Sequence, residues 1–293
     1  MKIKTILITG ASSGFGRDTA LTLARAGHRV YASMRDPAGR NRNKADALAS
    51  EAAGEKLSLK IIALDVTSTA SVNQAVASMV ADTGVIDVLI NNAGYATAGV
   101  SEGFTDAQVT QQFDVNVVGI QRMLRAVLPH MRKQKDGLVI NIGSILGRVT
   151  FPFFGIYGAS KFAVEALTES YRYEVSQLGV DVVLVQPSAY PTSMYSSAQF
   201  PSDTTSITEY GAVGEIPGAM FNHFMTVFQA DDAPNPHDIG RAIATLIAQP
   251  KGQRPVRIVV GADFGSATVN QQTEPVQAGV ITALGLGHLA TVV

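Results

Sequence analysis

Residues 4–16 read KTILITGASSGFG, and this stretch decides the fold. It begins with a short apolar, β-branched run that ends at Thr9, as is typical of a buried strand. Gly10, Gly14 and Gly16 then allow a tight turn, and the N-terminus of a following helix would offer free N–H groups to an anion. The spacing differs from the G-x-G-x-x-G dinucleotide fingerprint, and an ordinary strand-to-helix turn is the alternative. Because a strand precedes the glycines and a helical pattern follows them, we predict a nucleotide phosphate site here.

Strand and helix patterns alternate along the rest of the chain. We predict strands over residues 4–8, 29–34, 59–64, 85–90, 138–142, 180–185 and 256–260. We predict helices over residues 15–27, 45–53, 71–80, 106–132, 157–177 and 237–248, with the fourth broken only late, at Pro129. This alternation implies right-handed crossovers between parallel strands. The fold class is therefore α/β, a doubly wound seven-stranded parallel sheet with helices on both faces.

Polar residues follow the predicted strands, at the edge of the sheet where such folds bind ligands. After the second strand come Ser33, Met34 and Arg35, where NAD-binding proteins usually place an acidic residue for the ribose 2′-OH. Arg35 is instead a planar bidentate donor that suits a 2′-phosphate. We therefore predict NADP(H) in preference to NAD(H), although Asp36 follows and a solvated surface arginine is the alternative.

Gly143–Lys161, GSILGRVTFPFFGIYGASK, carries the candidate catalytic groups. Tyr157 and Lys161 are four residues apart, so on a helix they share one face. A nearby ammonium favours the phenolate, so we expect Lys161 to lower the pKa of Tyr157 from about 10 toward neutral. Ser144 precedes this helix and can offer its hydroxyl to the same reacting oxygen. Taken alone, a Tyr and a Lys at this spacing are more often a surface pair, and the other motifs of the chain carry the catalytic interpretation.

Composition excludes several other classes of protein. The net charge is −1, and the 23 Lys and Arg form no long run, which argues against nucleic acid as a partner. The chain has 0 Cys, so disulfides, thiolate metal sites and a cysteine nucleophile are excluded, and we predict no metal. No stretch is typical of a signal peptide or a membrane span, and we expect a cytoplasmic protein.

We interpret residues 1–293 as a single domain with two additions. Residues 188–236 are a long insertion rich in aromatic residues, Met, Ser, Thr, Gly and Pro, and long loops of this kind are usually functional. We predict that this insertion is a substrate lid and that its apolar side chains, with Phe151, Phe153 and Phe154, form the pocket. The apolar lid residues are Tyr190, Met194, Tyr195, Phe200, Met220, Phe221, Phe224, Met225 and Phe228. Residues 262–293 are a C-terminal extension, predicted to be a helix packed on the body or on a second subunit.

Taken together and in this order, the motifs resemble those of the short-chain dehydrogenase/reductase family. The matching positions are residues 9–16, Asn91–Gly94, Asn116, Ser144, Tyr157 and Lys161. The resemblance spans residues 3 to about 261 and implies a Rossmann-type fold. The pattern YASMRD at residues 31–36, with the insertion and the tail, is similar to the retinol and 17β-hydroxysteroid dehydrogenase branch and to carbonyl reductases. One departure is Pro187-Ser188, where the family often has Pro-Gly.

The resemblance implies hydride transfer between NADP(H) and a carbonyl or carbinol carbon. Tyr157 would be the general acid or base, and Lys161 would tune it and hold the nicotinamide ribose hydroxyls. Ser144 would position the substrate oxygen, and Asn116 would hold a water that links Lys161 to solvent. Asp65 and Val66 would contact the adenine. The full predicted cofactor set is Gly10, Ser12, Ser13, Gly14, Phe15, Gly16, Ser33, Arg35, Asp65, Val66, Asn92, Ala93, Gly94, Tyr157, Lys161, Pro187 and Thr192.

We therefore expect an NADP-dependent ketoreductase that acts reversibly on a hydrophobic ketone. A steroid or retinoid dehydrogenase is the alternative within the same class. An NADP-binding redox sensor is the alternative from another class, but such a sensor would be expected to lose the tyrosine or the lysine. The small hydrophobic carbonyl or alcohol substrate is the expected partner, and a homodimer and a homotetramer both stay open.

Overall fold

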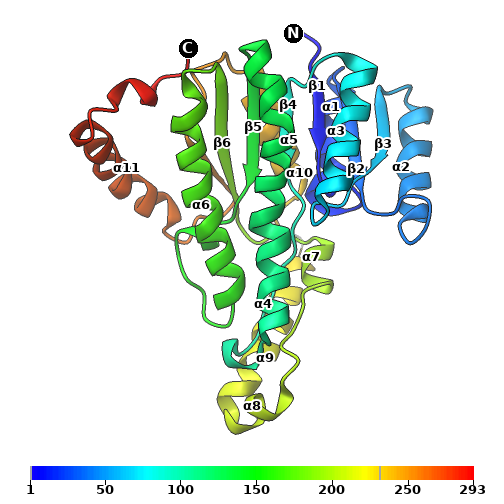
Figure 1. The fold of residues 1–293 in the computed structure, drawn as a ribbon. Coiled ribbons are helices and arrows are strands. Elements are labelled where there is room, and N and C mark those ends of the chain that lie inside the picture. The colour runs from blue at the N-terminus through cyan, green and yellow to red at the C-terminus, as the bar shows by residue number, and fades with distance from the viewer. Residues whose placement is uncertain (1, 231) are drawn as a thin grey trace.

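Among the residues that the computed structural model describes, 2–230 and 232–293, seven strands form one parallel sheet (Figure 1). The strands are β1 (Thr5–Ile8), β2 (Arg29–Met34), β3 (Leu59–Ala63), β4 (Val88–Asn91), β5 (Gly137–Ile142), β6 (Val180–Pro187) and β7 (Arg257–Val260). Their order is β3-β2-β1-β4-β5-β6-β7. The chain therefore changes direction across the sheet between β1 and β4, which is where such sheets open a ligand-binding crevice. The predicted doubly wound, seven-stranded parallel sheet is confirmed.

Helices cover both faces of this sheet because successive strand side chains point to opposite sides and both sets are apolar. Ile6 and Ile8 belong to one buried cluster and Leu7 to the other. The first cluster is closed by α1 (Gly14–Arg25), α2 (Arg42–Gly54) and α10 (His237–Ala248). The second is closed by α3 (Thr69–Thr83), α5 (Gly119–Gln134) and α6 (Gly155–Ser176). The carboxyl ends of the strands stay open between these two layers.

The prediction of one helix over residues 106–132, broken only at Pro129, is wrong. The chain forms α4 (Asp106–Phe113), a π-helical segment (Asp114–Val118) and then α5, which continues past Pro129. Pro129 lies on the exposed side of α5, while its neighbours Leu128 and Met131 are buried against the sheet, so packing holds the helix together. The interruption lies instead at Asn116, as is common for π-segments at functional sites.

The insertion at residues 188–236 is largely helical and is not an extended loop. It contains α7 (Ser193–Ser196), α8 (Thr204–Glu209) and α9 (Ala212–Phe228). Figure 1 shows α8 and α9 hanging beyond the carboxyl edge of the sheet. Tyr210 donates a hydrogen bond of 2.6 Å to Glu102, which lies in a short 3₁₀ turn (Ser101–Gly103), and this contact fastens the insertion to the body. The predicted lid function stays a prediction.

The C-terminal extension forms α11 (Ser266–Ala283) and a short 3₁₀ turn (Gly287–Ala290). This segment lies at the β7 end of the sheet, beside α6 (Figure 1). Gln177, at the end of α6, donates hydrogen bonds to the carbonyl oxygens of His288 and Thr291. Across the two described ranges, none of the helices combines the length and the apolarity needed to cross a membrane.

A buried ion pair fastens the edge of the sheet. Asp181 on β6 is fully buried, and its carboxylate accepts hydrogen bonds from Arg254 and, at 3.0 Å, from the backbone N–H of Gly252. Arg254 is also buried, and its guanidinium donates to the carbonyl oxygens of Leu246 and Gln249. These contacts hold the end of α10 and the segment before β7 against β6.

Asp181→Asn is predicted to lower the free energy of unfolding by about 3–5 kcal/mol, because it leaves the buried guanidinium without its charge partner. Urea unfolding of the variant beside the wild type measures this loss. The matched control is Arg241→Ala, which breaks an exposed pair with Asp238 on α10 and should cost less than about 1 kcal/mol. Equal losses in the two variants would contradict a special role for the buried pair.

Candidate active site

The turn between β1 and α1 is held open at the carboxyl edge of the sheet by a short polar clamp. Thr9 accepts hydrogen bonds of 3.0 Å at its hydroxyl from the backbone N–H groups of Asn92 and Ala93. The Asn92 amide returns two hydrogen bonds, to the carbonyl oxygens of Thr9 and Gly10. The turn after β1 and the segment after β4 are therefore locked together, and the N-terminus of α1 faces the crevice.

Two glycines of this turn cannot be replaced without a steric conflict. Gly10 has a φ of +69°, and a Cβ there would lie 2.8 Å from the Cα of Ala93. Gly16 is buried inside the first turn of α1, where a Cβ would lie 2.5 Å from the carbonyl oxygen of Gly10. Gly16 therefore supports the turn by close packing and does not face the crevice.

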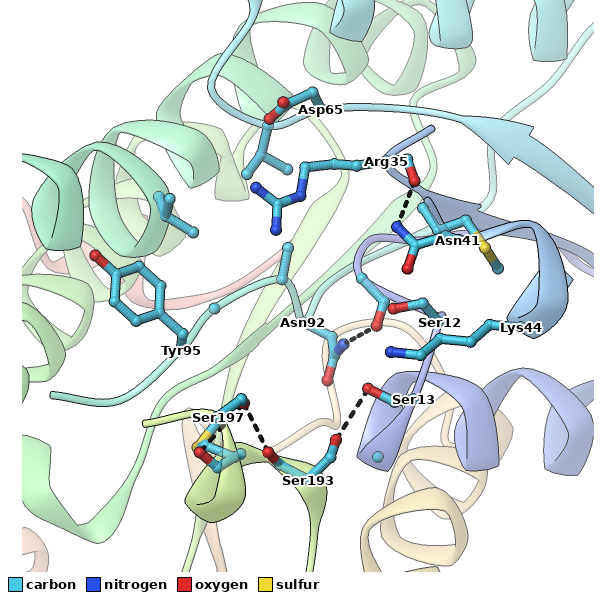
Figure 2. A pocket seen from close by; sticks show the side chains of 18 of the residues that line it. Ser12, Ser13, Arg35, Asn41, Lys44, Asp65, Asn92, Tyr95, Ser193 and Ser197 are labelled. Atoms are coloured by element: carbon cyan, nitrogen blue, oxygen red, sulfur yellow. Dashed lines mark hydrogen bonds between the residues drawn. The ribbon is translucent and has the colours of Figure 1, made fainter. Parts of the chain in front are cut away.

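A cavity of about 450 Å³ opens in front of the turn (Figure 2). The predicted cofactor residues that border it are Gly10, Ser12, Ser13, Gly14, Phe15, Arg35, Asp65, Val66, Asn92, Ala93, Gly94 and Thr192. Of the other predicted residues, Ser33 is fully buried behind the wall, with no hydrogen-bond partner for its hydroxyl, and Gly16 lies inside α1. The remaining three, Tyr157, Lys161 and Pro187, border a second, adjoining cavity.

Basic side chains gather where the cavity meets the end of β2. Figure 2 shows Arg35 directed into the cavity with Asn41 beside it, and Lys44 reaching toward Ser12 and Asn92. Arg40 and Lys44 also border the cavity, and neither was predicted from the sequence. Nothing in the sequence was a reason to select them, because they belong to no motif and lie in the polar stretch around the start of α2.

The carboxylate of Asp36 does not border the cavity, although Asp36 follows Arg35 in the sequence. Its carboxylate accepts a hydrogen bond of 2.8 Å from the backbone N–H of Arg40, within the turn that leads to α2. Its side chain closes so tightly on that turn that a Cβ on Gly39 would lie 2.3 Å from a carboxylate oxygen. The acidic residue next to Arg35 therefore organises the turn and does not border the cavity.

Asp65 follows β3, the strand next to β2, and lies near Arg35 (Figure 2). Burial tends to raise the pKa of its carboxyl group, but hydrogen bonds from Thr67 and the nearby charges of Arg35 and Arg40 outweigh burial and lower it. The backbone N–H and the hydroxyl of Thr67 both donate to the same oxygen, at 2.9 and 2.7 Å. Asp65 is thus a fixed acceptor beside the basic group.

The second cavity, of about 60 Å³, brings the three candidate catalytic side chains together. Ser144 comes directly after β5, whereas Tyr157 and Lys161 lie one turn apart on α6, and all three are buried. The Lys161 ammonium donates a hydrogen bond of 2.8 Å to the carbonyl oxygen of Ile142 and lies 5.6 Å from the centroid of the Tyr157 ring. Phe15, Asn92, Gly94, Thr192 and Met194 border both cavities, so the two spaces adjoin.

The expectation that the pKa of Tyr157 is lowered toward neutral is wrong for this structure. Burial raises the pKa of its phenol to about 12, and the hydrogen bond with Ser144 opposes that rise only in part. Burial also lowers the pKa of Lys161 to about 8, against the attraction of Glu165. Desolvation exceeds the hydrogen bond with Ser144 at Tyr157 and the attraction of Glu165 at Lys161, because the phenol and the ammonium are both removed from water.

Asn116 borders neither cavity. We expected its side-chain amide to hold a water, but the hydrogen bonds that the structure shows go to protein atoms. Its Oδ1 accepts from the backbone N–H of Tyr95 at 3.2 Å, and its Nδ2 donates to the Tyr95 carbonyl oxygen and to the Ser160 hydroxyl. Both N–H groups of the amide are thus used by protein atoms. The predicted water between Lys161 and solvent stays a prediction, and the visible contacts tie the segment after β4 to the turn of α6 that carries Lys161.

Apolar side chains enclose the second cavity. Phe151, Phe154, Met194, Tyr195 and Phe224 line it as predicted from their sequence positions, and Lys161 is the one Lys, Arg, Asp or Glu among its lining residues. The remaining predicted side chains, Phe153, Phe200, Met220, Phe221, Met225 and Phe228, do not line it.

Tyr190 has two roles, because it lines this cavity while its ring belongs to the buried core. The ring packs edge-on against Phe15, with 5.6 Å between the ring centroids.

The donor set of the larger cavity fits a dinucleotide. It offers a helix N-terminus beside a glycine turn for phosphate groups, a fixed carboxylate for a hydroxyl or an adenine amino group, and basic side chains at one end. By contrast, no group of three or more His, Asp or Glu that could hold a metal ion occurs in residues 2–230 or 232–293.

Known proteins resemble this chain over most of its length. A family model described as short chain dehydrogenase matches residues 4–201. A 3-ketodihydrosphingosine reductase of Bacteroides thetaiotaomicron is 36% identical over 263 residues, which cover 89% of each chain. Retinol dehydrogenase 8 of Homo sapiens is 33% identical over 255 residues, which cover 84% of this chain and 78% of that protein. The crystal structure of a short-chain dehydrogenase from Streptomyces avermitilis has a TM-score of 0.77 at 28% identity and covers 98% of both chains.

Thr9→Val is predicted to lower the free energy of unfolding by about 1–3 kcal/mol, since the N–H groups of Asn92 and Ala93 lose their shared acceptor. Thr9→Ser keeps the hydroxyl and is the matched control, with a smaller expected loss. Urea unfolding of both variants makes the comparison. A valine variant as stable as the serine variant would show that the clamp contributes nothing.

Proposed function

The chain belongs to the short-chain dehydrogenase family of oxidoreductases, and on this basis we propose that it reduces a hydrophobic ketone to the secondary alcohol with NADPH, reversibly. The observation that carries this proposal is the buried group formed by Ser144, Tyr157 and Lys161, which borders an apolar cavity next to the dinucleotide-shaped one. A proton donor, a charge and a hydride-donor site are thus neighbours at one edge of the sheet.

Tyr157 is the proposed proton donor in the direction of reduction. Because burial raises the pKa of its phenol to about 12, the group keeps its proton at neutral pH and is ready to donate it. The carbonyl oxygen of the substrate would lie between the phenol and the Ser144 hydroxyl, which donates a second hydrogen bond and fixes the geometry. As the substrate oxygen gains negative charge, the proton of Tyr157 moves to it.

Lys161 supplies the positive charge that this step requires. Its ammonium donates a hydrogen bond to the carbonyl oxygen of Ile142 and lies near the Tyr157 ring. In this buried place of low polarity, its attraction for a phenolate is stronger than in water. NADPH supplies the hydride when it is bound. Lys161 and Thr192 are the residues of this chain proposed to hold its nicotinamide end, with Pro187 beside them.

The preference for NADPH is supported by the charges at the end of β2. Arg35, Arg40 and Lys44 border the cavity, Met34 stands where an acidic residue would bind a ribose 2′-OH, and Asp36 is occupied within its own turn. A 2′-phosphate in this position would meet several donors, and the carboxylate of Asp36 would not face it.

The apolar walls support a hydrophobic substrate over a sugar or a phosphorylated compound, because Lys161 is the one charged residue that lines the small cavity. The relative from Bacteroides thetaiotaomicron is named as a reductase of a keto compound. A steroid or retinoid dehydrogenase is the second candidate, favoured by the similarity to retinol dehydrogenase 8. The aromatic residues of the insertion are proposed to cover the substrate as a lid.

Tyr157→Phe is predicted to lower kcat by roughly 10²–10⁴-fold, because it removes the general acid and leaves the ring in place. The dissociation constant of NADPH should change little, and nucleotide fluorescence titration is the control for an intact site. Turnover is followed as loss of NADPH absorbance with a hydrophobic ketone. Wild-type turnover in the variant would refute the assignment of the proton donor, and NADPH binding without turnover in the wild type would favour a redox sensor.

Arg35→Ala is predicted to weaken NADPH binding by roughly 10- to 100-fold, the cost of about 1.5–3 kcal/mol for a lost charge-assisted hydrogen bond. NADH binding should change far less, since it has no 2′-phosphate. Arg42→Ala is the matched control, because Arg42 is an exposed arginine of α2 that pairs with Asp46 and lies outside the cavity. Equal losses for the two nucleotides in Arg35→Ala would contradict the 2′-phosphate role.

A further inference from the structure

A buried carboxylate lies one helical turn beyond Lys161. Glu165 is only 4% exposed, and its Oε2 forms ion pairs with Nε of Arg148 at 3.2 Å and with Nε of Arg257 at 3.6 Å. Its Oε1 accepts a hydrogen bond from the Gln186 amide on β6. Removing a carboxylate from water costs free energy, and the ion pairs and the hydrogen bond offset this cost. Glu165 is therefore held firmly beside the proposed active site.

Glu165 is packed directly against the segment that follows Ser144. Gly147 ends the 3₁₀ turn Ile145–Gly147, and a Cβ there would lie 2.9 Å from Cγ of Glu165 and 3.0 Å from the carbonyl oxygen of Lys161. Arg148, the next residue, reaches back to the carboxylate. The turn of α6 that carries Lys161 and the loop that carries Ser144 are therefore fixed to each other through this one side chain.

The same carboxylate is connected to the C-terminal helix. The Asn270 amide on α11 donates a hydrogen bond of 2.7 Å to Oε1 of Gln186, and the amide of Gln186 in turn donates to Glu165. Gln186 is fully buried, so its contact with Glu165 is shielded from solvent, while the contact with Asn270 is partly buried. A continuous polar chain thus runs from α11 through β6 to α6, behind the proposed catalytic group.

We propose that Glu165 is a positioning residue for Lys161 and Ser144, and that α11 holds it in place through Asn270 and Gln186. This inference rests on the proposed function, because it assigns these residues a task in the same reaction. The C-terminal extension then contributes to catalysis from the β7 end of the sheet, without touching substrate or cofactor.

The charges around Glu165 explain how it would act. Arg148 faces it from the loop after β5, Arg257 from β7, and Lys161 from its own helix. Glu169, one turn further along α6, takes the other end of Arg257, with 2.9 Å between Nη2 and the carboxylate, which leaves Glu165 to balance the remaining cations. Replacing Glu165 by a neutral group would leave Lys161 among positive charges in a buried place, and its ammonium would lose its proton more readily.

The expected signature is therefore a change in pH dependence. Burial already lowers the pKa of Lys161 to about 8, and Glu165 opposes that effect. The protonated lysine is the active form, so kcat for reduction should fall as pH rises through the pKa of Lys161. Glu165→Gln should move this fall to lower pH by about one pH unit, which means a loss of about fivefold at pH 8 and little loss at pH 6.

The test compares Glu165→Gln and Asn270→Leu with two exposed controls, Glu174→Gln on α6 and Gln271→Leu on α11. The rate of NADPH-dependent ketone reduction is measured from pH 6 to pH 9. The protonation of Lys161 is measured independently by NMR with ¹³Cε-labelled lysine, and Lys161→Arg identifies the signal. Glu165→Gln should shift both curves, Asn270→Leu should shift them in the same direction by a smaller amount, and the controls should leave both unchanged.

The proposal is overturned if Lys161 titrates at the same pH in the wild type and in both network variants. It is also overturned if the controls shift the curves as much as the network variants do. Should Glu165→Gln fail to fold, Asn270→Leu decides the question, because an unshifted Lys161 titration in that variant removes the role of α11. A wild type with no ketone turnover would refute the proposed function, while the NMR titration would still decide whether the network sets the state of Lys161.

Discussion

The hydrogen bond from the Lys161 ammonium to the carbonyl oxygen of Ile142 joins the centre of the sheet to the proposed chemistry. The carbonyl group is available because β5 ends at Ile142, and the ammonium reaches it because α6 packs its buried face against this strand and its neighbour. A lysine in this position is removed from water, and that burial affects every group nearby. Tyr157 is buried beside it, and this burial of the phenol is why Tyr157 keeps its proton. The charge of Glu165 opposes the effect of burial on the pKa of Lys161.

The same strand edge also positions the proposed cofactor site, through a different kind of contact. Between the ends of β1 and β4, where the order of strands changes direction, the Thr9 hydroxyl accepts hydrogen bonds from the backbone N–H groups of Asn92 and Ala93. The side-chain amide of Asn92 donates in return to the carbonyl oxygens of Thr9 and Gly10. The parallel sheet creates the crevice, and these short polar contacts join the two backbone segments that border it. Neither group needs to react, because each has only to hold backbone in the shape that a phosphate would recognise.

Periodic signals in the sequence predicted most of the fold. The bounds of β2 and α10 agree with the predicted ranges 29–34 and 237–248, because each is a continuous apolar pattern with a clear end. The π-segment at Asn116 could not be predicted, since one extra residue in a helical turn leaves no mark in the period. The helices of the insertion were missed for a similar reason: they bury few side chains, so their pattern is weak.

Some residues of the candidate site could be predicted from the sequence, and others could not. Motif spacing placed Ser144, Tyr157 and Lys161 together, because strand ends and helix turns fix where those side chains lie. Arg40 and Lys44 were not found, because only the turn formed by Asp36 brings the start of α2 to the cavity. The direction of the Tyr157 pKa was also predicted wrongly, since charge spacing can be read from sequence whereas burial cannot.

The most direct test of the account is the rate of NADPH oxidation by the wild-type protein, measured with a matched series of ketones. The series would compare a large apolar ketone with a hydroxylated and a phosphorylated compound of similar size. The account predicts turnover that is highest with the apolar ketone, with NADPH preferred over NADH. Equal or higher turnover with the phosphorylated compound, or turnover with NADH alone, would contradict it.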